Sequence, residues 1–276
     1  AWVTPRPSVA IRVNRMPDAT LPDLVEQGEV PAIAAEFLRA CIRARRSIVV
    51  AGEMGAGKTV LLRALCAEIP PREAIGTFET VRELFLERHP ERHPVVHAWE
   101  ERPGSGERTA DGREAGAVSL VEALKNAYRF NLQRYIVGEV RGAEVMAMLE
   151  AMQSGGGSLS TVHSRDAVSA LGKLVTCMMA AGRQVSPDYA ARVIGEAIDV
   201  VVYVSLGRDE HGRRRRWVSE ILTVTPGESG AGWAHSHVFA PAPGGRLAAG
   251  VLPDDHAWLA EHGFDTRVFA DGLGAS

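Results

Sequence analysis

The stretch Gly52-Glu53-Met54-Gly55-Ala56-Gly57-Lys58-Thr59 decides the fold of this chain. Residues 47–51, which precede it, form an apolar run that predicts a short buried strand of a parallel sheet. Leucines at helical spacing follow it and predict a helix. A glycine-rich turn between a buried strand and a helix, with the pattern GxxxxGK[ST], is the context of a phosphate-binding loop.

The chemistry of such a loop comes from its backbone and from two side chains. Glycines let backbone N–H groups point inward around an anion, and the helix N-terminus adds partial positive charge. Lys58 is expected to reach the β and γ phosphates of ATP, and the Thr59 hydroxyl to bind Mg²⁺. We expect the nucleotide to contact Gly52, Glu53, Met54, Gly55, Ala56, Gly57, Lys58, Thr59 and Val60.

Length and composition fit one large α/β domain, or one domain with an appendage. The chain has 276 residues, 46% of them hydrophobic, which is enough for a sizeable core. Its formal charge of −3 gives no support for a nucleic-acid partner. The three cysteines lie in apolar helical patterns, as expected of buried thiols in a reducing cytosol. No apolar run approaches the roughly 18–20 residues needed to span a bilayer.

Hydrophobic periodicity divides the chain into alternating strands and helices. Strands are predicted at residues 9–13, 47–51, 74–79, 95–99, 135–140 and 159–162. Helical patterns cover residues 21–46 (interrupted near Gly28 and Pro31), 119–130, 143–152, 167–181 and 187–198. Residues 101–116 are predicted to form an exposed loop, and residues 199–206 and 217–224 a hairpin joined by residues 207–216. Beyond residue 225, a composition rich in Gly, Ala, Pro and Ser predicts an irregular tail with one short helix near 254–262.

Hydrolysis of a bound nucleotide requires a carboxylate that orients water. Glu139 ends the apolar strand at 135–140, at the edge where open α/β sheets bind ligands. The usual metal-binding aspartate before it is replaced by Gly138, so we expect Thr59 and phosphate oxygens to hold Mg²⁺, with Glu139 acting through water. Glu79 and Glu83 follow another strand, and a helical turn there would place them on one face.

His163, directly after a strand, is placed to hydrogen-bond or sense a phosphate, although a lone histidine is more often structural. The pair His235 and His237 lacks neighbouring ligand residues, so it is more often a solvated pair than a metal site.

Three further motifs follow the phosphate loop in a fixed order. Residues 77–84, 138–142 and 154–163 resemble the acidic "Asp box", the atypical Walker B sequence GEvRG and the "His box" of the secretion-ATPase superfamily. These traffic ATPases serve type II and type IV secretion and tight-adherence pilus assembly. The resemblance covers residues 9–225 and is closest to the tight-adherence branch.

The resemblance implies a RecA-like fold, a mainly parallel sheet flanked by helices. It also implies a hexameric motor that hydrolyses ATP at subunit interfaces and drives pilin assembly or secretion. Such a motor would be cytoplasmic and would bind platform proteins at the inner face of the plasma membrane. It would not itself span the membrane. Glu79, Glu83 and His163 match residues near the metal and phosphates; Arg141 and Arg129 match arginines of the same or a neighbouring nucleotide site.

In this family an N-terminal domain closes over the nucleotide. Here residues 1–20 would be its remnant or a linker, with Arg12 as a candidate site arginine, residues 21–225 the motor domain, and residues 226–276 the tail. Because the chain begins at Ala1 rather than Met, we expect either a trimmed piece of a longer protein or a short variant.

The chain departs from the family pattern at three points. Thr80 stands where the Asp box has an aspartate, the His box is one residue short and lacks its first histidine, and residues 131–133 replace Arg-Pro-Asp. Hydrolysis is still favoured, because Lys58, Thr59 and Glu139 are retained. Two alternatives stay open: a nucleotide-gated assembly subunit with little hydrolysis, and a conjugative DNA-transfer ATPase. For the latter, the basic run 213–216 is predicted to be a solvated turn or a contact for an acidic partner.

Overall fold

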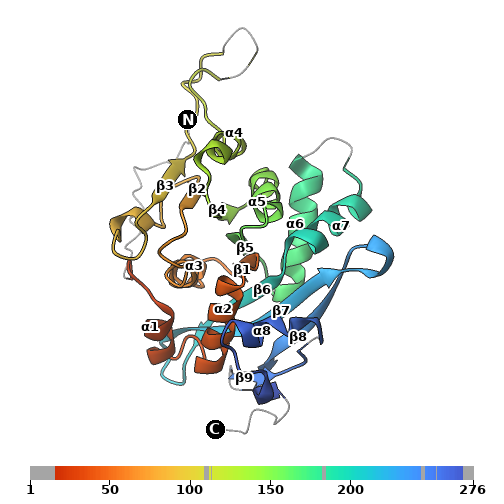
Figure 1. The fold of residues 1–276 in the computed structure, drawn as a ribbon. Helices are drawn as coiled ribbons and strands as arrows, with labels where there is room; N and C mark the ends of the chain where they lie inside the picture. The colour runs from red at the N-terminus through yellow and green to blue at the C-terminus, as the bar shows by residue number, and fades with distance from the viewer. Residues whose placement is uncertain are drawn as a thin grey trace.

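The fold is built on a mixed sheet of nine strands (Figure 1). The computed structural model describes residues 16–108, 112, 114–181, 185–243, 246–252 and 254–269. The strand order is β3-β2-β4-β5-β1-β6-β7-β8-β9. Strands β3 to β6 are parallel, and β6 to β9 are antiparallel. The predicted fold class, an α/β fold with a mainly parallel sheet, is therefore confirmed. The strand predicted at 9–13, with Arg12, lies outside the described residues.

The strands are β1 (Ile48–Gly52), β2 (Ile75–Glu79), β3 (Val96–Glu100), β4 (Arg134–Val140), β5 (Leu159–His163), β6 (Val200–Arg208), β7 (Arg214–Pro226), β8 (Trp233–Ala242) and β9 (Arg246–Ala249). The α-helices are α1 (Leu21–Glu26), α2 (Ala32–Arg43), α3 (Lys58–Cys66), α4 (Leu120–Ala127), α5 (Glu144–Gln153), α6 (Ala167–Ala181), α7 (Pro187–Ala197) and α8 (Trp258–Glu261). Short 3-10 helices are η1 (Leu86–Arg88), η2 (Tyr128–Phe130), η3 (Glu228–Gly230), η4 (Asp254–His256) and η5 (Thr266–Phe269). No helix among the described residues is long and apolar enough to cross a membrane.

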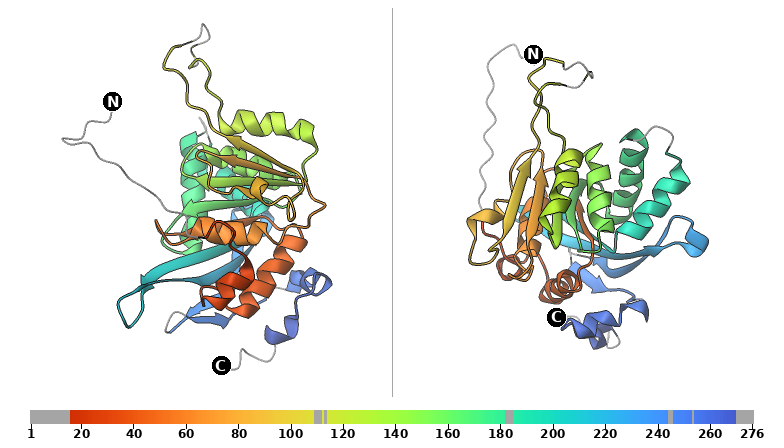
Figure 2. Two further views of the ribbon diagram at one scale, coloured as in Figure 1. Left: turned by 90° about the vertical axis from the view of Figure 1, so that its left-hand side faces the viewer. Right: turned by 45° about the horizontal axis from the view of Figure 1, so that its top comes forward.

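Helices cover both faces of the sheet, which explains why β1 is apolar at every position (Figure 2). Ile48 and Val50 face the layer that contains α1, α2 and α3, whereas Val49 and Ala51 face the layer of α4 to α7. A strand buried on both faces has no polar side to alternate with. Local signals fix the helix ends: Thr20 and Ser119 each form a reciprocal capping box with the third helical residue, and Ser186 caps α7.

The C-terminal segment differs from the prediction of an irregular tail. β8 pairs with β7 and β9 pairs with β8, so the sheet continues past residue 225 without a break. Phe239 on β8 and Phe264 after α8 are fully buried and pack edge-on against Phe37 of α2, with ring centroids 5.7 and 5.6 Å apart. The Gly- and Pro-rich composition concealed these strands because their stability comes from packing on α2 and pairing with β7.

The hairpin before this segment also differs in extent. β6 runs to Arg208 and β7 begins at Arg214, so the turn is only residues 209–213 rather than 207–216. Arg214 to Arg216 are therefore strand residues, and the prediction that they belong to a solvated turn is wrong.

The described residues of the segment between β3 and α4 (101–108, 112 and 114–118) form an arm that projects from the body (Figures 1 and 2). Isolated bridges join Arg102 to Val118 and Arg108 to Glu114. The segment predicted as an exposed loop therefore contains two isolated β-bridges.

Candidate nucleotide-binding site

The phosphate loop connects the carboxyl end of β1 to α3, as the sequence predicts. Gly57 is the N-cap of α3 with φ 98°, and no side chain caps the helix. The first backbone N–H groups of α3 are therefore not occupied by a side-chain cap, as an anion site requires. Gly52 also has to be glycine, because a Cβ there would lie 2.5 Å from the carbonyl oxygen of Val204 on β6. This loop geometry fits the binding of a phosphate chain.

Lys58 is buried at the start of α3, with only 7% of its surface exposed. Its Nζ donates to the carbonyl oxygens of Gly52 (3.2 Å) and Glu53 (3.1 Å) and lies 2.9 Å from Nδ1 of His163. These contacts hold the ammonium group over the loop, where an anion would meet it.

His163 links this lysine to the predicted catalytic carboxylate. Its Nε2 lies 2.7 Å from Oε1 of Glu139. Burial and the charge of Lys58 lower the pKa of His163, so the neutral ring is favoured. In that form Nδ1 accepts from Lys58 while Nε2–H donates to Glu139, which satisfies both contacts. The structure thus brings together three residues from β5, α3 and β4 that the sequence proposed separately.

Glu139 is held from its other side by Arg141. The Nε and Nη2 atoms of Arg141 lie 2.8 and 2.6 Å from Oε2 of Glu139. The hydrogen bond and the charge of Glu139 raise the pKa of Arg141. The register of β4 against β5 shifts between Val137 and Val140, an irregularity of the kind that re-aims a side chain beside a site.

Gly138 makes room for Glu79. A Cβ on Gly138 would lie 2.9 Å from Cγ of Glu79, so the volume of the missing Walker B side chain is taken by this glutamate. Glu79 is only 3% exposed, and its Oε1 accepts from the backbone N–H groups of Glu83 (2.9 Å) and Leu84 (3.0 Å). Burial raises the pKa of Glu79 to about 7, against the lowering effect of those two hydrogen bonds.

Glu83 contacts the predicted metal-binding threonine. The Thr59 hydroxyl donates to Oε2 of Glu83 at 3.0 Å. The helical turn considered between Glu79 and Glu83 does not form. Instead the chain bends, and the Glu79 carboxylate accepts from the backbone N–H of Glu83. Oxygen donors such as these suit Mg²⁺, which also takes phosphate oxygens and water. Among the described residues, no group of three or more His, Cys, Asp or Glu side chains is placed to hold a metal ion.

The structure places two further arginines, one away from the phosphate loop and one against it. Arg129 is exposed in η2, before the amino end of β4, and is therefore at the edge of the sheet opposite the phosphate loop. It does not join the other residues in its own subunit. Arg216, which the sequence placed in a solvated turn, donates from Nε to the carbonyl oxygen of Gly55 at 3.1 Å. No local signal separates Arg216 from its neighbours, because residues 213–216 are all arginine.

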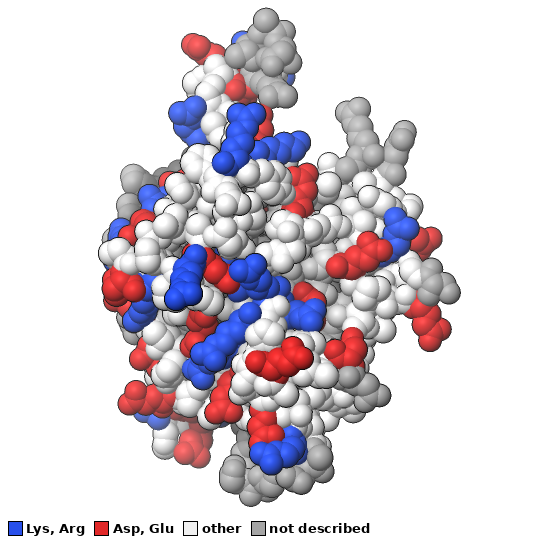
Figure 3. All heavy atoms as spheres, in the orientation of Figure 1, with Lys and Arg blue, Asp and Glu red and all other residues white. Residues whose placement is uncertain are grey.

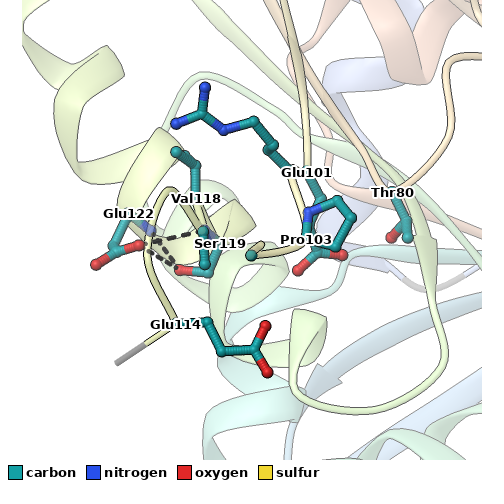
Figure 4. A pocket seen from close by; sticks show the side chains of 10 residues that line it. Thr80, Glu101, Pro103, Glu114, Val118, Ser119 and Glu122 are labelled. Atoms are coloured by element: carbon teal, nitrogen blue, oxygen red, sulfur yellow. Dashed lines mark hydrogen bonds between the residues drawn. The ribbon is translucent and has the colours of Figure 1, made fainter. Parts of the chain in front are cut away.

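Charged side chains of both signs lie on the surface. Figure 3 shows Lys and Arg side chains gathered near the middle of one face, with acidic side chains beside them. A hollow of about 670 Å³ lies at the base of the arm, and its charged lining residues are Glu101, Arg102, Glu114 and Glu122 (Figure 4). Three carboxylates against one arginine make that hollow a poor site for a phosphate.

A family model described as "Type II/IV secretion system protein" matches residues 3–225. The chain belongs to this family. PtlH of Bordetella pertussis, a type IV secretion system protein, is 40% identical over 185 residues, 66% of this chain and 52% of PtlH. VirB11 of Brucella suis is 33% identical over 67% of this chain and 49% of its own length. A putative conjugal transfer protein of Mycobacterium tuberculosis is 33% identical over 80% of this chain and 58% of its own length.

Two solved structures share the fold. The VirB11 ATPase of Brucella suis in complex with sulphate has a TM-score of 0.57 at 29% identity, covering 73% of this chain and 54% of VirB11. The Legionella pneumophila ATPase DotB has a TM-score of 0.56 at 22% identity, covering 74% of this chain and 52% of DotB. The chain spans about half the length of these relatives. The predicted membership in the secretion-ATPase superfamily is confirmed.

Proposed function

We propose that this chain is the ATP-hydrolysing motor domain of a type IV secretion or pilus-assembly machine. The observation that carries the proposal is the continuous set of contacts from Lys58 through His163 to Glu139, built on a phosphate loop. It couples the group that would bind the phosphates to the group that would orient water. A glycine-rich turn with a purely structural role would not need this arrangement.

The resting contacts suggest how the site responds to nucleotide. The loop N–H groups bind the phosphates, and the ammonium of Lys58 exchanges His163 and carbonyl oxygens for phosphate oxygens. His163 then loses its donor at Nδ1 while it still holds Glu139 through Nε2. Glu139, positioned by His163 and Arg141, is placed to orient the attacking water. Thr59 and Glu83 would hold Mg²⁺, which neutralises charge on the phosphates when bound.

Two substitutions test the proposal. Lys58→Ala should weaken nucleotide binding and lower ATP turnover by on the order of 10²-fold or more, since it removes the cation that meets the phosphates. Glu139→Gln should retain nucleotide binding and lose turnover to a similar extent, because the amide cannot serve as the base. Phosphate release and calorimetric nucleotide binding are the measurements. Lys125→Ala, which changes an exposed lysine of α4, is the matched control.

Wild-type turnover in Lys58→Ala would refute the assignment of the phosphate loop. Unchanged turnover in Glu139→Gln would move the water-orienting role to Glu79 or Glu83.

A second candidate is a nucleotide-gated subunit that hydrolyses ATP only slowly. One carboxylate oxygen of Glu139 contacts His163 and the other contacts Arg141. With both oxygens engaged, Glu139 is less available to orient water, which favours slow hydrolysis. A wild-type turnover no faster than that of Glu139→Gln, together with tight nucleotide binding, would select this candidate. A third candidate, conjugative DNA transfer, is favoured by the similarity to the putative conjugal transfer protein. Stimulation of ATP turnover by DNA would support it.

We also propose that the protein acts as a hexamer in the cytoplasm, against inner-membrane platform proteins. The exposed position of Arg129, across the sheet from its own phosphate loop, supports a role at a neighbouring subunit's site. The assignment to the tight-adherence branch stays a prediction. The division into residues 1–20, 21–225 and 226–276 also stays a prediction, although the sheet runs across its second boundary.

A further inference from the structure

The β6–β7 hairpin extends past the end of β1 and runs beside the phosphate loop. The parallel pairing of β1 with β6 ends at Gly52 and Val204, yet β6 continues for four more residues to Arg208. The antiparallel return places Arg216 opposite Leu206, within this extension. The hairpin therefore brings a side chain from residue 216 to a loop more than 150 positions earlier in the sequence.

Arg216 spans the crest of the loop, residues 55–57. Its Nε donates to the carbonyl oxygen of Gly55 at 3.1 Å. Its Cδ lies 3.1 Å from the position that a Cβ on Gly57 would take, so the aliphatic part of the side chain covers that glycine. Gly55 and Gly57 have φ of 77° and 98°, in the left-handed region that glycine adopts without steric cost. A single side chain thus contacts both flexible positions of the crest.

A third segment is bonded to β7 beside Arg216. The carbonyl oxygen of Glu29, between α1 and α2, accepts from the backbone N–H of Val218 at 2.7 Å, which fixes this segment on β7 two residues from Arg216. Burial raises the pKa of Glu29, and the positive charge of Arg216 lowers it in part. The Glu29 carboxylate and the Arg216 guanidinium therefore attract each other.

The other arginines of the run have different surroundings. Arg213 pairs with Asp209 at 2.9 Å, Arg215 lies over the ring of Trp217 at 5.3 Å, and Arg214 is exposed. Of the four, only Arg216 has a hydrogen bond to the phosphate loop among the described residues.

We propose that Arg216 is a positioning residue of the nucleotide site, which holds residues 55–57 in the conformation that binds phosphates. This inference rests on the proposed function. The crest contributes N–H groups to the phosphates that ADP and ATP share, whereas Lys58 reaches the γ phosphate of ATP as well as the β phosphate. Loss of Arg216 should therefore weaken the binding of both nucleotides equally and leave the chemical step little changed.

The test compares Arg216→Ala, Arg216→Lys and Arg214→Ala in the full chain. Calorimetry gives the Kd of ADP and of a non-hydrolysable ATP analogue with Mg²⁺, and phosphate release gives KM and kcat. Arg216→Ala should raise both Kd values and KM about tenfold or more, with kcat changed by less than about threefold. Arg216→Lys should recover most of the affinity, because an ammonium still donates to Gly55. Arg214→Ala, on the same strand with the same charge change, should match the wild type.

Two further readouts separate positioning from general stability. The Tm without nucleotide should be unchanged in Arg216→Ala, whereas the rise in Tm on adding ADP should shrink. Glu29→Gln should raise the Kd less than Arg216→Ala does, and the double variant should bind no worse than Arg216→Ala, because Glu29 acts through Arg216.

Three results would overturn the inference: wild-type affinity for ADP in Arg216→Ala, an effect on the ATP analogue alone, or an equal effect of Arg214→Ala. If Lys58→Ala abolishes nucleotide binding while Arg216→Ala retains it, only this inference fails. If the wild type binds no nucleotide, the proposed function fails as well.

Discussion

Replacing Glu79 by glutamine should stabilise the folded protein at neutral and alkaline pH and leave its stability unchanged in acid. Glu79 is almost fully buried at the end of β2, and burial raises its pKa from 4.5 to about 7. An acid whose pKa is raised by folding contributes stability below its unfolded pKa, and that contribution is lost as the pH rises through the folded pKa. The loss between pH 4.5 and about pH 7 corresponds to on the order of 3 kcal/mol.

Glutamine removes this pH dependence without removing the local hydrogen bonds. Its Oε1 can still accept from the N–H groups of Glu83 and Leu84, which Glu79 Oε1 binds in the wild type. Glu79→Gln should therefore equal the wild type near pH 4.5 and exceed its free energy of unfolding by about 3 kcal/mol at pH 8. The same variant should lose ATP turnover. A group that destabilises the fold beside a nucleotide site is expected there when function needs it.

Urea unfolding at pH values from 4.5 to 8 measures the effect, as the difference between the variant and the wild type. The difference is needed because buried His93, whose pKa is lowered to about 4 by burial, has the opposite trend. Its contribution is present above pH 6.5 and is lost as the pH falls through about 4, so it partly masks Glu79 in the wild-type curve. Glu100→Gln, which removes the exposed carboxylate opposite Glu79 in the β2–β3 register, is the control. A difference that stays constant from pH 4.5 to 8 would show that the two N–H groups keep Glu79 ionised, which would refute the reasoning.

Arg134 on β4 has no exposed surface and donates to Oε2 of Glu73 and to the carbonyl oxygen of Ile42. Arg134→Ala should therefore lower the free energy of unfolding by about 3–5 kcal/mol, because both acceptors lose their buried donor and Glu73 keeps only its pair with the more exposed Arg45. The half-exposed pair of Arg39 and Glu68 provides the control, and Arg39→Ala should cost less than about 1 kcal/mol in urea unfolding; equal losses would contradict the role of burial. For the proposed hexamer, sedimentation with a non-hydrolysable ATP analogue should give a mass about six times 29.7 kDa. A monomer under all conditions would rule out assembly by this chain alone.

The sequence predicted those parts of the site that lie within one contiguous stretch. The phosphate loop, Lys58 and Thr59 follow one another along the chain, so the strand–turn–helix context was enough to place them. Glu139 and His163 were also predicted, because each ends a strand of a parallel sheet and such ends meet at one edge. Arg129, which was proposed from the family resemblance, precedes the amino end of its strand and lies at the opposite edge.

Tertiary structure alone decided how these residues contact each other. The fit of Glu79 into the space beside Gly138 depends on the pairing of β2 with β4, which no local pattern encodes. The contact of Arg216 with the phosphate loop depends on how far the β6–β7 hairpin extends past β1.

The same distinction accounts for the C-terminal segment. Its composition is typical of an irregular tail, yet β8 and β9 form because β7 offers an unpaired edge and Phe37 offers an apolar surface for Phe239. The sequence by itself determined the phosphate loop, the α/β class and the family, because short-range periodicity and turn chemistry are written in consecutive residues. Only the tertiary structure decided which distant side chains complete the site, because those contacts follow from strand order and register.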